Sequence, residues 1–143
     1  MSNKQNGNRF EQELAAKLAK YGFWVHVMQQ NKAGQPADII AVGKHLCTMI
    51  DCKDVESGDS FRLSRVEENQ KLAMSMFEDK TDRECWFAIR FCDGEIYMLS
   101  WDYIDFYARN GFASIRRTQM DMDLDDPEEW VHTFEHWIMV QKY

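Results

Sequence analysis

The sequence predicts a mixed α/β (α+β) domain with a central mixed sheet flanked by helices, and three observations carry this prediction. Residues 8–21 place apolar side chains at helical spacing. Two short apolar runs, 39–42 and 46–50, flank a Gly-Lys-His break that is typical of a tight hairpin. Residues 84–92 are almost continuously apolar, as in a strand covered on both faces. Helical and strand patterns therefore alternate along the chain.

The first half of the chain divides into a helix and three strands. The helix expected over residues 8–21 is closed by Gly22. Residues 23–28 form a strand in which His26 is a partly exposed side chain rather than a ligand or base. A polar loop over residues 29–36 then leads into the hairpin.

The second half begins with a polar connector at residues 54–60. Ser64 is a favourable N-cap, with Glu67 three residues later, for a helix that continues to Phe77. The strand at 84–92 turns at Asp93-Gly94 into a strand at 95–99.

Residues 100–143 are expected to be mainly helical. Ser100 caps a helix that ends near residue 110, and residues 114–117 form a short edge strand. A last helix begins at Pro127 and places Trp130 and the apolar residues up to Ile138 on one stripe, as core or as a dimer contact.

Composition limits the classes of protein that fit. With 143 residues, 45% of them hydrophobic, the chain is long enough for one globular domain. No apolar run approaches the roughly 18–20 residues of a membrane span, so no membrane partner is expected. The four cysteines show no metal-binding spacing and are expected to be free thiols of a cytoplasmic protein.

The net charge of −7 comes entirely from the second half. Residues 1–80 carry 11 basic and 11 acidic side chains, whereas residues 81–143 carry 6 and 13. The acidic excess is concentrated at residues 121–129. A DNA-facing surface is therefore possible on the first half only.

The hairpin brings charged residues together at its open end. If the loop is Lys44-His45, Asp38 lies directly opposite Asp51, with Cβ atoms roughly 5 Å apart, and Lys53 shares the face of Asp51. Two carboxylates this close are stabilised by a divalent cation such as Mg²⁺. The alternative is a charged strand end that frays into solvent, and a shift of one residue in the turn would separate the two aspartates.

Further candidates surround this hairpin. Glu11 lies at the edge of the apolar stripe of the first helix, and Gln70 lies on or beside the buried stripe of the second, where an amide needs partners. Candidate DNA-backbone contacts are polar or basic residues of the flanking segments: Lys32, Gln35, Arg62, Arg65 and Lys71.

The constellation resembles the PD-(D/E)XK nuclease superfamily. Pro36-Ala37-Asp38 followed by Asp51-Cys52-Lys53 is similar to its two-part signature, with Ala37 inserted and Asp51 where glutamate is commoner. Within it, residues 7–77 resemble Holliday junction resolvases of the archaeal and RecU types, including phage-borne ones. The stretch Gly7–Leu14 with Glu11, and Phe61-Arg62-Leu63 before Asn69-Gln70, carry this resemblance.

The resemblance implies a restriction-endonuclease-like αβββαβ core over residues 8–99, after a flexible tail at 1–7 and before a C-terminal helical extension at 100–143. It implies an Mg²⁺-dependent endonuclease, with Mn²⁺ a possible substitute and no organic cofactor. Glu11, Asp38 and Asp51 would hold the metal, and Lys53 and Gln70 would complete the catalytic set. A homodimer would make paired symmetric nicks in four-way junctions. A restriction- or repair-type endonuclease and a catalytically inactive binding module remain the alternatives.

Overall fold

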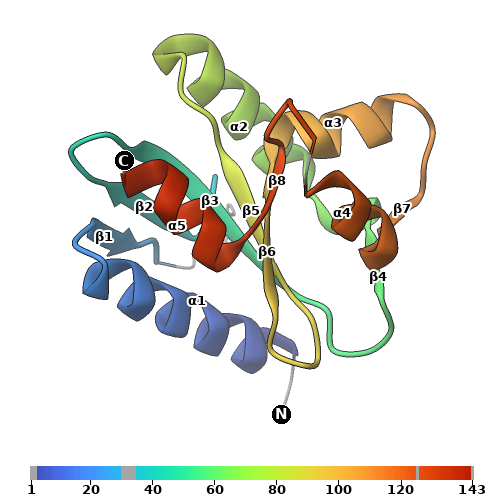
Figure 1. Cartoon of the computed structure of the whole chain (residues 1–143), viewed down its shortest axis with the longest axis horizontal. Helices are drawn as coiled ribbons and strands as arrows, with labels where there is room; N and C mark the ends of the chain where they lie inside the picture. Colours follow the sequence, from blue (N-terminus) through green and yellow to red (C-terminus); the bar gives the residue numbers. More distant parts are fainter. Residues whose placement is uncertain (1–2, 30–34, 125, 143) are drawn as a thin grey trace.

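The protein is seen here as a computed structural model that describes residues 3–29, 35–124 and 126–142. Its elements form three layers (Figure 1). In chain order they are α1 (Asn3–Lys20), β1 (Trp24–Val27), β2 (Ile39–Val42), β3 (Cys47–Asp54), β4 (Ser60–Arg62), the 3-10 turn η1 (Leu63–Arg65), α2 (Glu68–Thr81), β5 (Trp86–Arg90), β6 (Ile96–Ser100), α3 (Trp101–Arg109), β7 (Ser114–Arg116), α4 (Arg117–Asp123), β8 (Val131–Thr133) and α5 (Phe134–Lys142).

The middle layer is a six-stranded sheet with the order β1-β2-β3-β5-β6-β8. Strands β3 and β5 run parallel and every other neighbouring pair is antiparallel. The expected mixed sheet is therefore confirmed. The parallel pair requires a crossover, and η1 and α2 lie in that connection.

The two faces of the sheet bury separate apolar clusters. Helices α1 and α5 cover one face, where Leu14 and Trp137 pack with Ile50 of β3. Helices α2, α3 and α4 contribute to the other cluster, which contains Met49. Because side chains alternate along a strand, Cys52 belongs to the α1 face, whereas Asp51 and Lys53 lie on the α2 face.

A second, two-stranded sheet lies beside the main one and pairs β4 with β7. The pairing is antiparallel, with Arg62 opposite Ser114, and Leu63 N donates to Ala113 O at 3.0 Å. The sequence predicts β7 but misses β4, because residues 60–62 form a strand only through a partner about fifty positions away. This pairing holds the segment before α2 against the loop after α3.

Both helices of the first half begin at residues other than those expected. α1 begins at Asn3, so residues 3–7 are helical rather than part of a flexible tail, and the first two residues lie outside the described part. These polar residues carry no apolar periodicity, which leaves them invisible to a pattern argument. The predicted Ser64 cap of α2 is wrong, because Ser64 lies in η1 and Glu67 is the N-cap.

The C-terminal region also differs from the expected helical extension. The helix predicted from Pro127 begins only at Phe134, and residues 131–133 instead form β8, which pairs with β6 at the sheet edge. Helix α4 was not predicted. Phe134, Trp137 and Ile138 are buried within this chain, so the stripe is core and is not available as a dimer contact. Ser100 caps α3 as predicted and accepts from Tyr103 N at 3.2 Å.

Among the described residues, none of the helices combines the length and apolar character needed to cross a membrane.

Candidate active site

The register of the β2–β3 hairpin brings two aspartates together. Ile39 pairs with Ile50, and Asp38 N donates to Ile50 O at 3.1 Å, which places Asp38 across from Asp51 as predicted. At the opposite end the turn is closed by Gly43 N donating to Leu46 O at 2.7 Å. A Cβ atom at Gly43 would lie 2.7 Å from the ring of Phe23, so only glycine allows this close approach.

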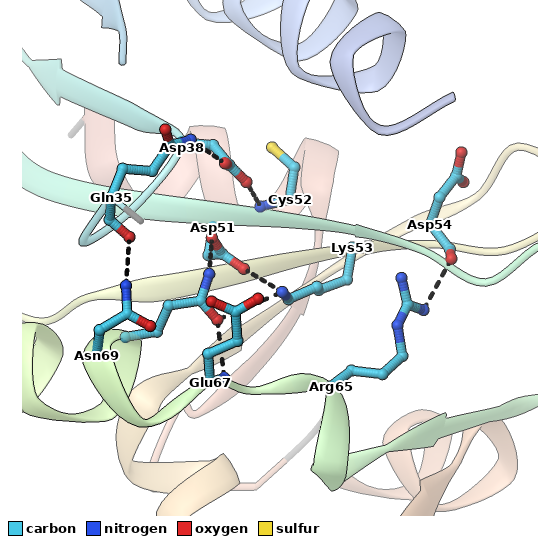
Figure 2. Close-up of polar contacts among 10 residues, drawn as sticks. Gln35, Asp38, Asp51, Cys52, Lys53, Asp54, Arg65, Glu67 and Asn69 are labelled. Carbon is cyan, nitrogen blue, oxygen red and sulfur yellow. Dashed lines mark hydrogen bonds and ion pairs between the residues drawn. The ribbon is translucent and has the colours of Figure 1, made fainter. Parts of the chain in front are cut away.

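Asp38 immediately precedes the first residue of β2, and β3 extends beyond it on the neighbouring strand. Its Oδ2 atom accepts from the backbone N of Cys52 at 2.7 Å, and this bond takes the place of a ladder contact. Its Oδ1 atom accepts from Gln35 Nε2 at 2.9 Å. Figure 2 shows Asp38 between Gln35 and Cys52 at this end of the strand. Both carboxylate oxygens of Asp38 are thus held in place.

Asp51 is fully buried on β3 and is held by two neighbouring side chains. Gln70 Nε2 donates to its Oδ1 atom at 2.9 Å, and Lys53 Nζ lies 3.1 Å from its Oδ2 atom (Figure 2). Lys53 Nζ also donates to Gln70 Oε1 at 3.3 Å. Among the described residues, Asp51 Oδ2 has no hydrogen-bond donor besides the charged Lys53, and the carboxyl group of Asp38 also lies close to that of Asp51.

The first turn of α2 supplies Gln70 and fixes its orientation. Glu67 and Gln70 form a capping box, in which Glu67 N donates to Gln70 Oε1 at 3.1 Å. One residue earlier, Asn69 Nδ2 donates to Gln35 O at 3.2 Å. The same turn therefore binds both β3 and the segment that leads to Asp38. The prediction that Gln70 lies buried and partnered is confirmed.

Glu11 completes the group from the opposite layer. It lies on α1, is buried, and shares a hydrogen bond with Asp38. Burial, with the charge and hydrogen bond of Asp38, raises the pKa of Glu11 to about 8. Burial and the charge of Asp38 likewise raise the pKa of Asp51 well above its ordinary value. Three carboxylates thus gather with a single ammonium group.

The chemistry of this group fits a divalent cation. Within the described ranges, no three His, Cys, Asp or Glu side chains are already arranged as a closed metal site. The donors are nevertheless carboxylate oxygens, the ligands that Mg²⁺ prefers, and Asp51 Oδ2 has an unfilled acceptor position. A cation would also offset the mutual repulsion that raises the pKa values of Glu11 and Asp51.

The predicted DNA contacts divide into three groups. Arg62 and Arg65 are exposed beside the catalytic strand, and Arg65 Nη1 donates to Asp54 O at 2.8 Å. Lys71 pairs with Glu68 at 3.1 Å on α2. Gln35 is buried and bonds Asp38, so its side chain supports the carboxylate group. Lys32 lies outside the described residues.

Sequence reasoning missed a brace that fixes α1 to the end of β3. Arg90 on β5 makes two hydrogen bonds to Asp54, of 3.1 and 2.9 Å, and its Nη1 atom lies 2.5 Å from Glu13 Oε2. Its guanidinium also covers the ring of Phe10, 4.3 Å from the centroid. Because Phe10 and Glu13 flank Glu11 on α1, Arg90 sets where Glu11 lies. No local pattern could have revealed residues so far apart in the chain.

Asn69 was also missed as a site residue. Sequence reasoning treated it as part of a motif, whereas its amide ties α2 to the Gln35 backbone. In the sequence, the only available signal was an amide side chain next to Gln70.

Comparison with known proteins agrees with this geometry. Residues 2–132 match the family model described as archaeal Holliday junction resolvase (Hjc). No curated protein sequence matches the chain.

Among solved structures, Hjc of Archaeoglobus fulgidus, a Holliday junction resolvase from an archaeal hyperthermophile, is similar with a TM-score of 0.63. The similarity covers 81% of this chain and 93% of that chain at 17% identity, which establishes a shared fold. The family model covers most of the present sequence. The chain therefore belongs to the archaeal Holliday junction resolvase family and is a junction-resolving endonuclease.

Proposed function

We propose that this endonuclease hydrolyses DNA phosphodiester bonds with Mg²⁺, or Mn²⁺ in its place, held by Asp38, Asp51 and Glu11. One observation carries the proposal: the hairpin register pairs the two aspartates at one strand end, with Lys53 Nζ 3.1 Å from Asp51. A bound Mg²⁺ would neutralise charge on the scissile phosphate and lower the pKa of a water molecule. No organic cofactor enters this scheme.

The remaining site residues act on the water and the phosphate. Lys53 Nζ lies at the rim of the carboxylate group, where it orients the attacking water or stabilises negative charge on the phosphate. Gln70 bonds both Asp51 and Lys53, so it is a positioning residue that keeps the ammonium group aimed at the carboxylates. The products are expected to be nicks with 5′-phosphates.

The DNA backbone is expected to follow the basic side of the site. Arg62, Arg65 and Lys71 surround the segment between β3 and α2, and Lys32 and Gln35 belong to the loop before Asp38. Because phosphate contacts position DNA without reading its sequence, this arrangement suits a substrate recognised by shape.

Paired, symmetric nicks require two sites, which a homodimer with twofold symmetry supplies. Leu72 and Met76 support such an assembly, since both are largely exposed and lie one turn apart on α2, next to the site. A dimer mass in sedimentation at micromolar concentration checks this part of the proposal. Action on chromosomal DNA is expected to take place in the cytoplasm.

The function is tested by cleavage of a labelled four-way junction and a matched linear duplex, each with Mg²⁺ and with EDTA. We expect paired nicks in the junction that disappear with EDTA, and a fall of about 10²–10⁴-fold in the cleavage rate of Lys53→Ala. Lys44→Ala is the matched control, because Lys44 lies in the turn at the opposite end of the same hairpin.

Each contrary result has a definite meaning. Full metal-dependent activity in Lys53→Ala would overturn the site assignment. Equal cutting of linear duplex would leave the carboxylate site intact but would indicate a general endonuclease. Junction binding without any cutting, with Mn²⁺ also tried, would indicate a catalytically inactive binding module.

A further inference from the structure

Two neighbouring hollows lie at the end of β3 and along the segment that follows it. The first, of about 310 Å³, is lined by residues of β3 and the connector after it, including Cys52, Asp54 and Arg65. The second, of about 600 Å³, is lined by Lys71, Phe112 and their neighbours. The hollows share Ser60 and Arg62 and are therefore adjacent, and together they are called the groove. This groove joins the catalytic strand to the loop after α3.

Phe112 stands at the far end of the groove and is rigidly held. Helix α3 ends in a Schellman motif, with Gly111 in the left-handed region at φ 82°, Gly111 N bonded to Ala108 O and Phe112 N bonded to Tyr107 O. The Phe112 ring packs on Tyr107 with centroids 5.0 Å apart, the apolar contact that usually accompanies this motif. Even so, 53% of Phe112 is exposed.

Cations line the same groove. The Arg62 side chain forms no hydrogen bond or ion pair with any other described residue, and the Lys71 side chain is paired only with the highly exposed Glu68. The backbone pairing of β4 with β7 places Arg62 opposite Ser114, two residues from Phe112. Two carboxylates, Asp54 and Glu56, line the first hollow, whereas neither of them lines the second hollow with Phe112. The Phe112 end therefore combines an exposed aromatic ring with available positive charge.

We propose that this groove binds a DNA strand leaving the cleavage site, with its phosphates on Arg62 and Lys71 and an unpaired base stacked on Phe112. This inference rests on the proposed function and adds how a branch is distinguished from a continuous duplex. Base pairs at a branch point are more easily opened than those inside a duplex, because they lack one stacked neighbour. An aromatic ring next to phosphate-binding cations is the arrangement that holds single-stranded DNA without reading sequence.

The test measures stacking directly and without cleavage. A four-way junction carries the fluorescent base 2-aminopurine next to the branch point, and protein is added in EDTA. In the open junction this base is only partly stacked and fluoresces, so the wild-type protein should quench it by a larger fraction than it quenches the same base inside a linear duplex, where base stacking already suppresses the emission. Phe112→Leu keeps an apolar contact for Tyr107 but removes the aromatic face, so it should abolish this extra quenching and weaken junction binding about tenfold.

Phe106→Leu is the matched control. Phe106 is exposed to a similar extent, 49%, on the helix that precedes Phe112, but its ring faces Trp130 and does not line the groove. It should bind and quench like the wild type, and Phe112→Trp should restore quenching. Arg62→Ala should reduce the salt dependence of binding, whereas Arg109→Ala, which removes an exposed cation outside the groove, should not.

The outcomes separate this inference from the proposed function. If Phe112→Leu quenches and discriminates junction from duplex like the wild type, the groove inference is wrong even though metal-dependent cleavage is intact. If the wild-type protein quenches the fluorescence and Phe112→Leu does not, the groove inference is supported even if Lys53→Ala retains activity, because the binding assay contains no metal. An equal loss in Phe106→Leu and Phe112→Leu would also overturn the inference, since it would indicate a general effect on α3.

Discussion

Two groups of neighbouring carboxylates can be compared in the described part of the chain: one is buried, and in the other only Glu78 is partly buried while Glu84 and Asp102 are exposed. The first is Glu11, Asp38 and Asp51 at the open end of the hairpin. The second is Glu78, Glu84 and Asp102, around the start of β5. In both groups burial and neighbouring negative charge raise carboxyl pKa values, to about 8 for Glu11 and about 7 for Glu78.

The difference lies in what faces the carboxylates. Asp51 has an ammonium group and an amide directed at it, and Asp38 has a second amide and a backbone N–H. In the second group, Glu78 accepts from Cys85 N at 3.1 Å, and no described Lys or Arg forms an ion pair with any member. A raised carboxyl pKa alone therefore does not identify an active site. Hydrogen-bond donors that converge on the carboxylates are the further feature that marks a candidate active site.

The largest expected difference between the groups is in catalysis. Asp51→Asn keeps the size and the Gln70 hydrogen bond but removes a charge of the proposed Mg²⁺ site, so junction cleavage should fall on the order of 10³-fold. Mg²⁺ at ten times its dissociation constant should stabilise the wild type by about 1.4 kcal/mol in a thermal unfolding assay, and the variant much less. Normal cleavage by Asp51→Asn would contradict the assignment of the first carboxylate group as the active site.

A smaller effect is expected from the brace that holds the first group together. Arg90→Ala leaves Asp54 and Glu13 without their shared cation, so unfolding in urea should show a loss of about 2 kcal/mol. Cleavage should also slow, because α1 no longer holds Glu11 in place. Arg9→Ala is the control, since Arg9 pairs with the same Glu13 at 3.5 Å but is exposed, and should cost under about 0.5 kcal/mol. Equal losses in both variants would contradict a positioning role for Arg90.

The smallest expected effect belongs to the second group and has the opposite sign. The pKa of Glu78 rises from 4.5 to about 7 on folding, so the folded state binds more protons and stability falls as pH rises from about 4.5 to 7. Glu78→Gln removes this loss. The variant should be more stable at pH 8 by up to about 1 kcal/mol, a value reduced for partial solvent exposure. At pH 4 it should match the wild type in urea unfolding, and its cleavage should be unchanged. A variant less stable at pH 8 would contradict the pKa argument.

The sequence predicts the hairpin site well because its geometry is local. A two-residue turn and the alternation of side chains are enough to place Asp38 opposite Asp51 and Lys53 on the same face. Gln70 could be found for a related reason, since an amide on a buried helical stripe needs partners.

What the sequence does not predict depends on contacts between distant residues. Ser64 has the chemistry of an N-cap, but the pairing of β4 with β7 draws its segment into η1 and shifts the cap to Glu67. Residues 131–133 become a strand only because β6 offers an open edge. Arg90, Asp54 and Glu13 come from three different elements, so no local pattern links them. Gln35 was expected to contact DNA, because its hydrogen bond to Asp38 depends on the folded position of the loop and cannot be read from the sequence.

The alternation that puts Asp51 and Lys53 in the site also turns Cys52, between them, toward the α1 core (Figure 2). There, burial and the charges of Asp38, Asp51 and Glu11 raise the pKa of its thiol well above the ordinary value. Since the thiolate is the form that reacts with oxidants and alkylating agents, this cysteine is chemically protected. Strand β3 thus carries a thiol between two of the proposed site residues, and this thiol is shielded from oxidants, whereas Cys92 is exposed.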